Sequence, residues 1–105
     1  MEEILLVVHD KDKVKYATSL ARELTEKLTK DDIKVTIFAE GSPAARMLIQ
    51  EEGKLSTIKE HGGEIISCVH DIQDRERLER ISRVVSECAT ELKKKETEGA
   101  SVITV

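Results

Sequence analysis

The sequence predicts a single α/β domain, residues 1–105, in which a mostly parallel sheet is covered by helices on both sides. Two observations predict it. Apolar runs typical of buried strands alternate along the chain with helical patterns, and the connections between the strands are too long for hairpins. The composition, with 39% hydrophobic residues, 36% charged residues and one proline, is that of a globular domain and excludes a disordered chain.

The first half of the chain begins with a strand, a helix and a second strand. Residues 4–8 form an unbroken apolar run, which predicts a central strand buried on both faces. Residues 14–28 repeat apolar side chains at every third or fourth position, as an amphipathic helix does. Residues 33–39 alternate apolar side chains with Lys34 and Thr36, so we expect the second strand to be less completely covered than the first.

A second helix is predicted after that strand, where the sequence runs Gly41, Ser42, Pro43. Ser42 fits the N-cap, Pro43 fits the first helical position, and Gly53 is a suitable end. Residues 55–61 then read as one or two helical turns, closed by glycines at 62 and 63.

The second half of the chain leaves one alternative open. Residues 64–69 predict a third strand with Cys68 near its end. The apolar positions that follow fit a single helix over residues 76–95. The β-branched residues 81–85 fit equally a short fourth strand, followed by a helix over residues 86–98 and a last strand over 101–105.

Charge and cysteine usage limit the function classes. The net charge is −4 and the longest basic run is three lysines, which disfavours binding to nucleic acid or to an anionic membrane. The short N-terminal apolar run fits neither a signal peptide nor a membrane span, so we expect a cytoplasmic protein. Two cysteines without a CxxC motif are expected to stay as thiols there, without a structural disulfide. The lack of Asn and the abundance of Glu, Lys, Ile and Val are typical of thermophile proteins.

Residues that could carry chemistry lie at the ends of three of the predicted strands, and the carboxyl ends of parallel strands meet at one edge of a sheet. They are His9 and Asp10 after the first strand, Gly41 and Ser42 after the second, and Cys68, His70 and Asp71 after the third. Cys68 is the candidate catalytic thiol, and the alternative is a small buried side chain. His70 and His9 are candidates to stabilise its thiolate, or each is a solvated neighbour of an aspartate. Cys88 lies on an apolar stripe and is expected to be buried and slow to react.

The remaining candidates concern ligands. We expect no metal, because His9, His61, Cys68 and His70 lack the spacing of a zinc site. Asp10, Gly41, Ser42 and Asp71 are candidate ligand-binding residues at the same edge. The turn at Gly41 could bind an anion through backbone N–H groups, although helix capping is the simpler interpretation. No motif indicates a cofactor.

Three short segments resemble the DsrE/DsrF-like family, which has the YchN-like fold. They are Gly62-Gly63-Glu64-Ile65-Ile66-Ser67-Cys68, a glycine before a hydrophobic strand that ends in cysteine; Phe38-Ala39-Glu40-Gly41 at the end of strand two; and the turn Thr97-Glu98-Gly99 before a short terminal strand. The order of elements is similar over nearly the whole chain. The resemblance implies a three-layer α/β/α sandwich with a five-stranded parallel sheet, a short strand within residues 81–85, and a homo-oligomer, commonly a trimer or hexamer.

The resemblance also implies a function. In the sulfur-relay branch of that family the strand-three cysteine carries a persulfide, and this role transfers to Cys68 only. The sequence departs from the family pattern after the cysteine, where Val69, His70 and Asp71 stand in place of a small residue, Asn and Thr or Ser. We therefore hold two hypotheses. One is a sulfurtransferase-like sulfur carrier that exchanges with donor and acceptor proteins through an accessible Cys68, and the other is a noncatalytic module that binds a small ligand or a protein at the same edge.

Overall fold

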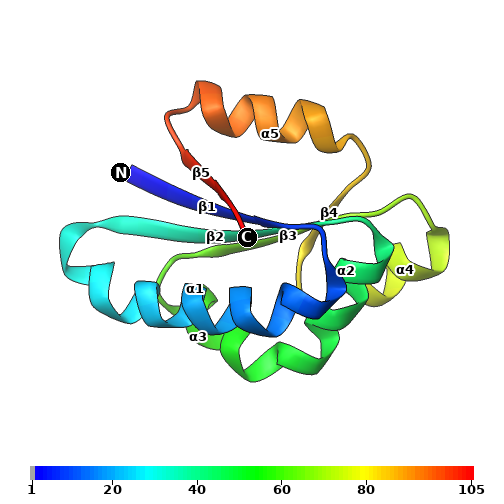
Figure 1. The fold of residues 1–105 in the computed structure, drawn as a ribbon, viewed down its shortest axis with the longest axis horizontal. Coiled ribbons are helices and arrows are strands. Elements are labelled where there is room, and N and C mark those ends of the chain that lie inside the picture. Colours follow the sequence, from blue (N-terminus) through cyan, green and yellow to red (C-terminus); the bar gives the residue numbers. More distant parts are fainter. Residues whose placement is uncertain (1) are drawn as a thin grey trace.

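A computed structural model describes residues 2–105 and has three layers, with helices on both faces of a five-stranded sheet (Figure 1). The strand order is β4-β3-β2-β1-β5, and every neighbouring pair is parallel. The strands are β1 (Glu2–Val8), β2 (Ile33–Glu40), β3 (Glu64–Cys68), β4 (Arg83–Val85) and β5 (Ser101–Thr104). The predicted α/β sandwich is confirmed.

The helices are divided unequally between the two faces. They are α1 (Val14–Leu28), α2 (Ser42–Met47), α3 (Glu52–Glu60), α4 (Ile72–Leu78) and α5 (Cys88–Thr97), with short 3-10 turns η1 (Lys11–Lys13), η2 (Thr29–Asp31) and η3 (Leu48–Glu51). Within residues 2–105, α1 to α4 lie on one face and α5 alone lies on the other (Figure 1). The chain steps from β1 to β4 in one direction and then crosses back to β5, so right-handed crossovers place the last helix on the opposite face.

Each face has its own hydrophobic core, because successive strand residues point to opposite sides of the sheet. The larger core lies against α1 to α4 and includes Leu6, Val8, Ile37, Ala17, Leu48 and Ile58. The smaller one lies against α5 and consists of Leu5, Val7, Phe38, Ile66 and Cys68. Leu5 and Leu6 are therefore sequence neighbours that support different layers.

Two expectations about the first strands need correction. β1 is inside the sheet, as its apolar run indicates, but β2 occupies the middle position. β2 is also not the less covered strand, since residues 35–39 are all buried. The misleading residue was Thr36, which is fully buried and donates its hydroxyl to Glu3 instead of facing solvent.

The second helix also differs from its prediction. Gly41, with φ +95°, occupies the N-cap position, and Ser42 is the first helical residue, so Ser42 is not the cap. Gly53 does not end the helix: α2, η3 and α3 follow one another without a break, and Gly53 lies exposed in the first turn of α3. A solvent-facing glycine weakens a helix by only about 1 kcal/mol, which the buried Leu55 and Ile58 of α3 can offset.

The open alternative in the second half is decided in favour of a short strand. Arg83–Val85 form β4 beside β3, and α5 begins at Cys88, so a continuous helix over residues 76–95 is wrong. Ile81 and Ser82 lie outside the strand. Helix α4 was not predicted as a separate element, although Asp71 marks its start as the N-cap. None of the helices described for residues 2–105 is both long enough and apolar enough to cross a membrane.

Candidate functional site

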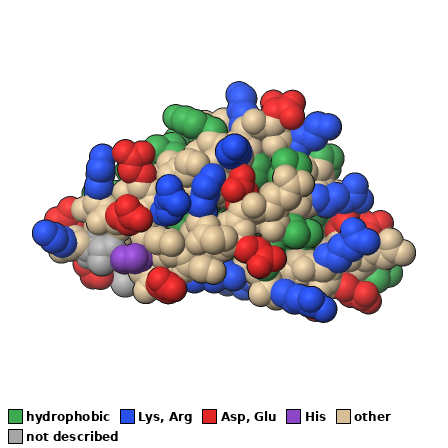
Figure 2. Space-filling view, turned by 90° about the horizontal axis from the view of Figure 1, so that it is seen from below, with side chains coloured by type: hydrophobic (Ala, Val, Ile, Leu, Met, Phe, Trp, Pro, Cys, Tyr) green, Lys and Arg blue, Asp and Glu red, His purple; other side chains and the backbone are tan. Residues whose placement is uncertain are grey.

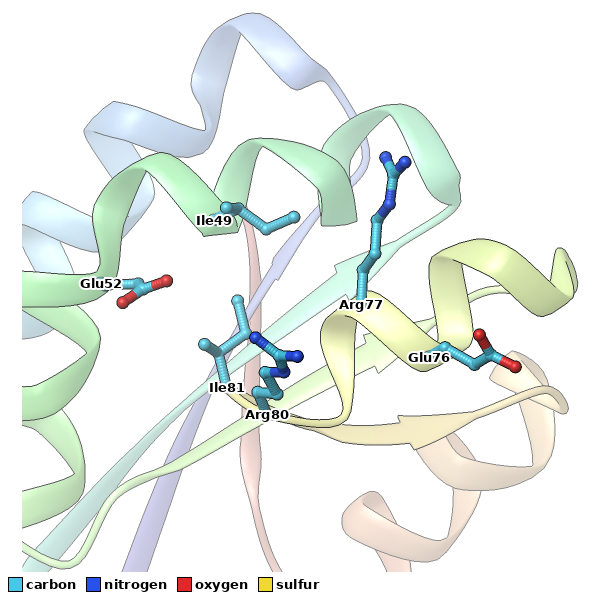
Figure 3. Close-up of a pocket in the computed structure, with 6 residues that line it drawn as sticks. All are labelled: Ile49, Glu52, Glu76, Arg77, Arg80 and Ile81. Carbon is cyan, nitrogen blue, oxygen red and sulfur yellow. The ribbon is translucent and has the colours of Figure 1, made fainter.

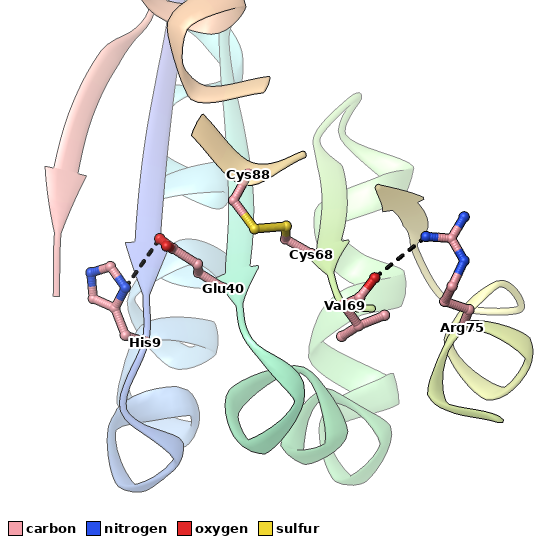
Figure 4. Close-up of a disulfide and its surroundings, with 6 residues drawn as sticks. All are labelled: His9, Glu40, Cys68, Val69, Arg75 and Cys88. Atoms are coloured by element: carbon pink, nitrogen blue, oxygen red, sulfur yellow. Dashed lines mark hydrogen bonds and ion pairs between the residues drawn. A yellow bond between two sulfur atoms is a disulfide. The ribbon is translucent and has the colours of Figure 1, made fainter. Parts of the chain in front are cut away.

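Cys68 and Cys88 are joined by a disulfide at the carboxyl edge of the sheet, with their Cα atoms 5.7 Å apart (Figure 4). The expectation of two free thiols is therefore wrong. The expected accessibilities are reversed as well. Cys68 is 1% exposed and buried under α5, whereas Cys88 is half-buried. Cys88 is thus the member of the pair nearer to solvent.

The register of the sheet explains why residues twenty positions apart meet. Cys68 is the last residue of β3 and pairs with Val85, the last residue of β4. The Val69 amide then donates to the Val85 carbonyl at 3.0 Å. Past Val85 the chain turns onto the other face, and Cys88, three residues later, begins α5 above the end of β3. The separation of twenty residues in the sequence does not by itself predict the disulfide, because the two cysteines meet only when β3 and β4 pair in this register.

The position of Cys88 is chemically favourable for a thiolate. It is the first residue of the ten-residue helix α5, and no side chain caps that end. The unpaired N–H groups and the dipole at a helix N-terminus stabilise an anion there. The flanking carboxylates of Glu87 and Glu91 act in the opposite direction. Cys88 is therefore the sulfur that an incoming group reaches first, and Cys68 stands behind it.

Glu40 is the charged residue closest in register to the disulfide. It ends β2 and pairs directly with Cys68 on β3, so both side chains point to the α5 face. Its Oε2 atom lies 3.1 Å from Nδ1 of His9 (Figure 4). His9 therefore contacts Glu40, while His70 is an exposed residue beyond the end of β3. Glu40 was not among the predicted site residues, although its place at the end of the second strand was a usable signal.

The other predicted residues gather at the same edge, where they organise backbone. Asp10 accepts a hydrogen bond from the Asp12 amide at 2.8 Å, and Asp71 accepts one from the Asp74 amide at 3.0 Å. The Gly41 amide donates to the Cys68 carbonyl at 2.9 Å, which ties the α2 turn to the cysteine strand. These residues lie at one edge of the sheet, as the parallel topology predicts; Asp10 and Asp71 cap the helical turns that follow them, and the Gly41 amide is already bonded to Cys68 and is not open to an anion.

A second ionic contact braces this edge from the α1 to α4 side. Arg46 Nε donates to Asp74 Oδ1 at 2.8 Å, and the Asp74 side chain is buried. The hydrogen bond from Arg46 lowers the pKa of Asp74, burial opposes this, and the Ser42 hydroxyl adds to it. This arrangement ties α2 to α4 below the disulfide.

A groove away from the disulfide is lined by both apolar and charged side chains. This groove of about 520 Å³ lies between η3, α3 and α4, and Figure 3 shows Ile49 and Ile81 on its two sides. Two arginines and two glutamates also line it, namely Arg77, Arg80, Glu52 and Glu76. Figure 2 shows basic and acidic side chains interspersed over the face that carries α1 to α4. Residues 2–105 contain no cluster of three or more His, Cys, Asp or Glu able to hold a metal ion.

Comparisons of the sequence with protein-family models and with curated proteins give no match.

Proposed function

We propose that the protein is a sulfur carrier that works through the Cys68–Cys88 pair. The observation that supports this is the pair itself: a half-buried cysteine at a helix N-terminus bonded to a buried cysteine at a strand end. Such a pair can accept sulfur on one thiol and resolve the product with the other. The proposal keeps the DsrE-like relationship and the sulfurtransferase-like activity inferred from the sequence, but moves the sulfur-accepting role from Cys68 to Cys88.

Loading starts from the reduced pair. The Cys88 thiolate attacks the sulfane sulfur of a persulfide donor, a new S–S bond forms on Cys88, and the donor leaves as a thiol after taking up a proton. The helix N-terminus supports the anionic sulfur before attack and in the persulfide that results.

Two routes then unload the sulfur. An acceptor thiolate can attack the terminal sulfur of the Cys88 persulfide, which moves that sulfur to the acceptor and restores the Cys88 thiolate. Alternatively the Cys68 thiolate attacks Cys88 Sγ, the Sγ–Sγ bond closes, and the sulfane sulfur leaves as hydrosulfide. In this second route the two thiols supply the two electrons that reduce the sulfur, and a dithiol reductant must reopen the pair.

The test is the mass of each protein after reduction, removal of the reductant and incubation with glutathione persulfide. We expect Cys68→Ser to keep one added sulfur atom on Cys88, since no second thiol resolves it. The wild type should instead release hydrosulfide and return to the disulfide. Cys88→Ser should load slowly because Cys68 ends a strand and has no helix N-terminus to stabilise its thiolate, and the double Ser variant is the control.

The competing function is a noncatalytic binding module in which the disulfide is only a covalent brace. The burial of Cys68 favours this binding-module function. If neither single variant loads, or if Cys88→Ser loads as fast as Cys68→Ser, the carrier proposal is wrong and the module takes its place.

We also propose a homo-oligomer, a trimer or hexamer, from the DsrE-like resemblance. The edge strand β5 is exposed along its length and carries Val102 and Ile103, 36% and 47% exposed, which is surface suited to a second copy. Sedimentation equilibrium tests this, and a mass near 11.8 kDa at micromolar concentration would contradict it.

A further inference from the structure

Helix α5 has few apolar contacts for an element that covers a whole sheet face. Two of its residues, Cys88 and the half-buried Leu92, pack on the small core formed by Leu5, Val7, Phe38, Ile66 and Cys68. Its outer surface is exposed and mostly polar, with Ala89, Thr90, Lys93, Lys94, Thr97 and Glu98. Hydrophobic burial by the helix is therefore concentrated at its middle and at its first residue.

Two strong attachments hold the ends of α5. At the first residue the disulfide joins Cys88 to β3. Near the other end, Lys95 is buried, and its Nζ atom donates to Glu3 Oε2 at 3.0 Å and to Glu64 Oε1 at 3.2 Å. Burial of Lys95 opposes its charge, but the hydrogen bonds that its ammonium donates to these two carboxylates outweigh it and raise the pKa of the ammonium. One attachment depends on the redox state, and the other does not.

The segments on either side of α5 add little support. The helix connects β4 to β5, which are the two edge strands and are three and four residues long. On its C-terminal side the chain turns at Gly99, with φ +95°. Losing the disulfide therefore leaves the N-terminal end of α5 held by Leu92, by the exposed ion pair in which Arg83 Nη1 donates to Glu91 Oε2 at 3.3 Å, and by a short strand at the sheet edge.

We infer that α5 is a redox-gated cover over one face of the sheet. This rests on the proposed function, which requires the pair to be reduced and reoxidised. A dithiol delivers two electrons, the Sγ–Sγ bond breaks, and two thiols form. The N-terminal end of α5 then lifts away while Lys95 keeps the other end in place. Opening exposes Phe38, Ile66 and the otherwise buried Cys68, so the reduced protein presents both thiols to its partners.

Hydrogen exchange followed by mass spectrometry tests the gate without any sulfur donor. The wild type is compared in its disulfide form and after reduction with a phosphine. We expect the amides of α5 to exchange about 100-fold faster after reduction, which corresponds to the usual effect of losing a disulfide. The amides of α1, on the opposite face, should exchange at the same rate in both forms.

Variants separate the two attachments. Cys88→Ser cannot form the disulfide with Cys68. Its α5 amides should therefore exchange as fast as those of the reduced wild type, even under oxidising conditions. Lys95→Met should accelerate exchange at the C-terminal end of α5 even in the disulfide form. Lys94→Met, on the exposed side of the same turn, is the matched control and should change neither end.

Two results would overturn the gate. Equal exchange of α5 in both redox states means that the helix is held without the disulfide. A uniform acceleration in α1 and α5 means that reduction unfolds the whole domain, so the disulfide is a global brace. Failure of persulfide loading with a normal opening of α5 would instead contradict the sulfur-carrier proposal and leave the conformational response standing.

Discussion

The two faces of the sheet are built by different kinds of interaction. The face under α1 to α4 is covered by helices that bring many buried apolar side chains of their own, such as Ala17, Leu48 and Ile58. The face under α5 combines a small apolar core with a disulfide at one end and an ion cluster at the other. Apolar burial is insensitive to redox state and pH, whereas a disulfide responds to redox state and a buried ion pair responds to pH. The first face therefore gives the domain its stability, and the second can change with conditions.

Leu5 and Leu6 give the sharpest test of this difference and the largest expected effect. Both are fully buried and adjacent, but they point to opposite faces. We expect Leu6→Ala to lower the free energy of unfolding by about 4 kcal/mol and Leu5→Ala by about 2 kcal/mol. The difference arises because the single helix α5 can move into the cavity left by Leu5 more completely than the packed helices α1 to α4 can fill the one left by Leu6. Urea denaturation of the oxidised proteins measures both values. An equal or larger loss for Leu5→Ala would show that the α5 face is packed as rigidly as the other.

The second test uses the ion cluster under α5. Burial of Glu64 favours its neutral form, but hydrogen bonds from Arg83 and Lys95 outweigh this and lower the pKa of the carboxyl. A lowered pKa stabilises the fold above the unfolded value, about 4.3, and this contribution is lost as the pH falls through the folded value. The raised pKa of Lys95 stabilises the fold below about pH 10.4 and is lost as the pH rises through the folded value.

In Lys95→Met, the free energy of unfolding should therefore no longer fall at alkaline pH because of this residue. Its fall at acid pH should be smaller than in the wild type. At neutral pH we expect the substitution to cost about 1–3 kcal/mol, since Glu3 and Glu64 lose a buried donor but keep their contacts with Lys34. The measurement is the free energy of unfolding against pH. Lys94→Met is the control, and the proposal about the cluster is wrong if both variants give the wild-type curve.

The same comparison explains what the sequence could and could not predict. Strands β1 to β3 and α1 were predictable because their apolar patterns are local, and the parallel topology followed from the connections. The pattern over residues 81–85 fitted a helix as well as a strand, so β4 was left open. The α5 face was not, because its determinants are long-range. Lys95 belongs to a run of three lysines that looks like a solvated surface, yet β1 and β3 supply the carboxylates that bury it. The edge where the site residues meet was predictable from topology, whereas the disulfide required the β3–β4 register.

The last and smallest effect concerns Glu40, the charged neighbour of the pair. Its carboxylate lies beside Cys68 in register and contacts His9, which is about half exposed. A negative charge at this position disfavours the thiolate, and solvent screens the interaction. We expect Glu40→Gln to speed alkylation of the reduced pair at neutral pH by about threefold. Glu26→Gln, an exposed substitution on the opposite face, should leave the rate unchanged. Slower alkylation in Glu40→Gln would mean that the carboxylate accepts a thiol proton, and the functional site would then include the Glu40–His9 pair as well as the two cysteines.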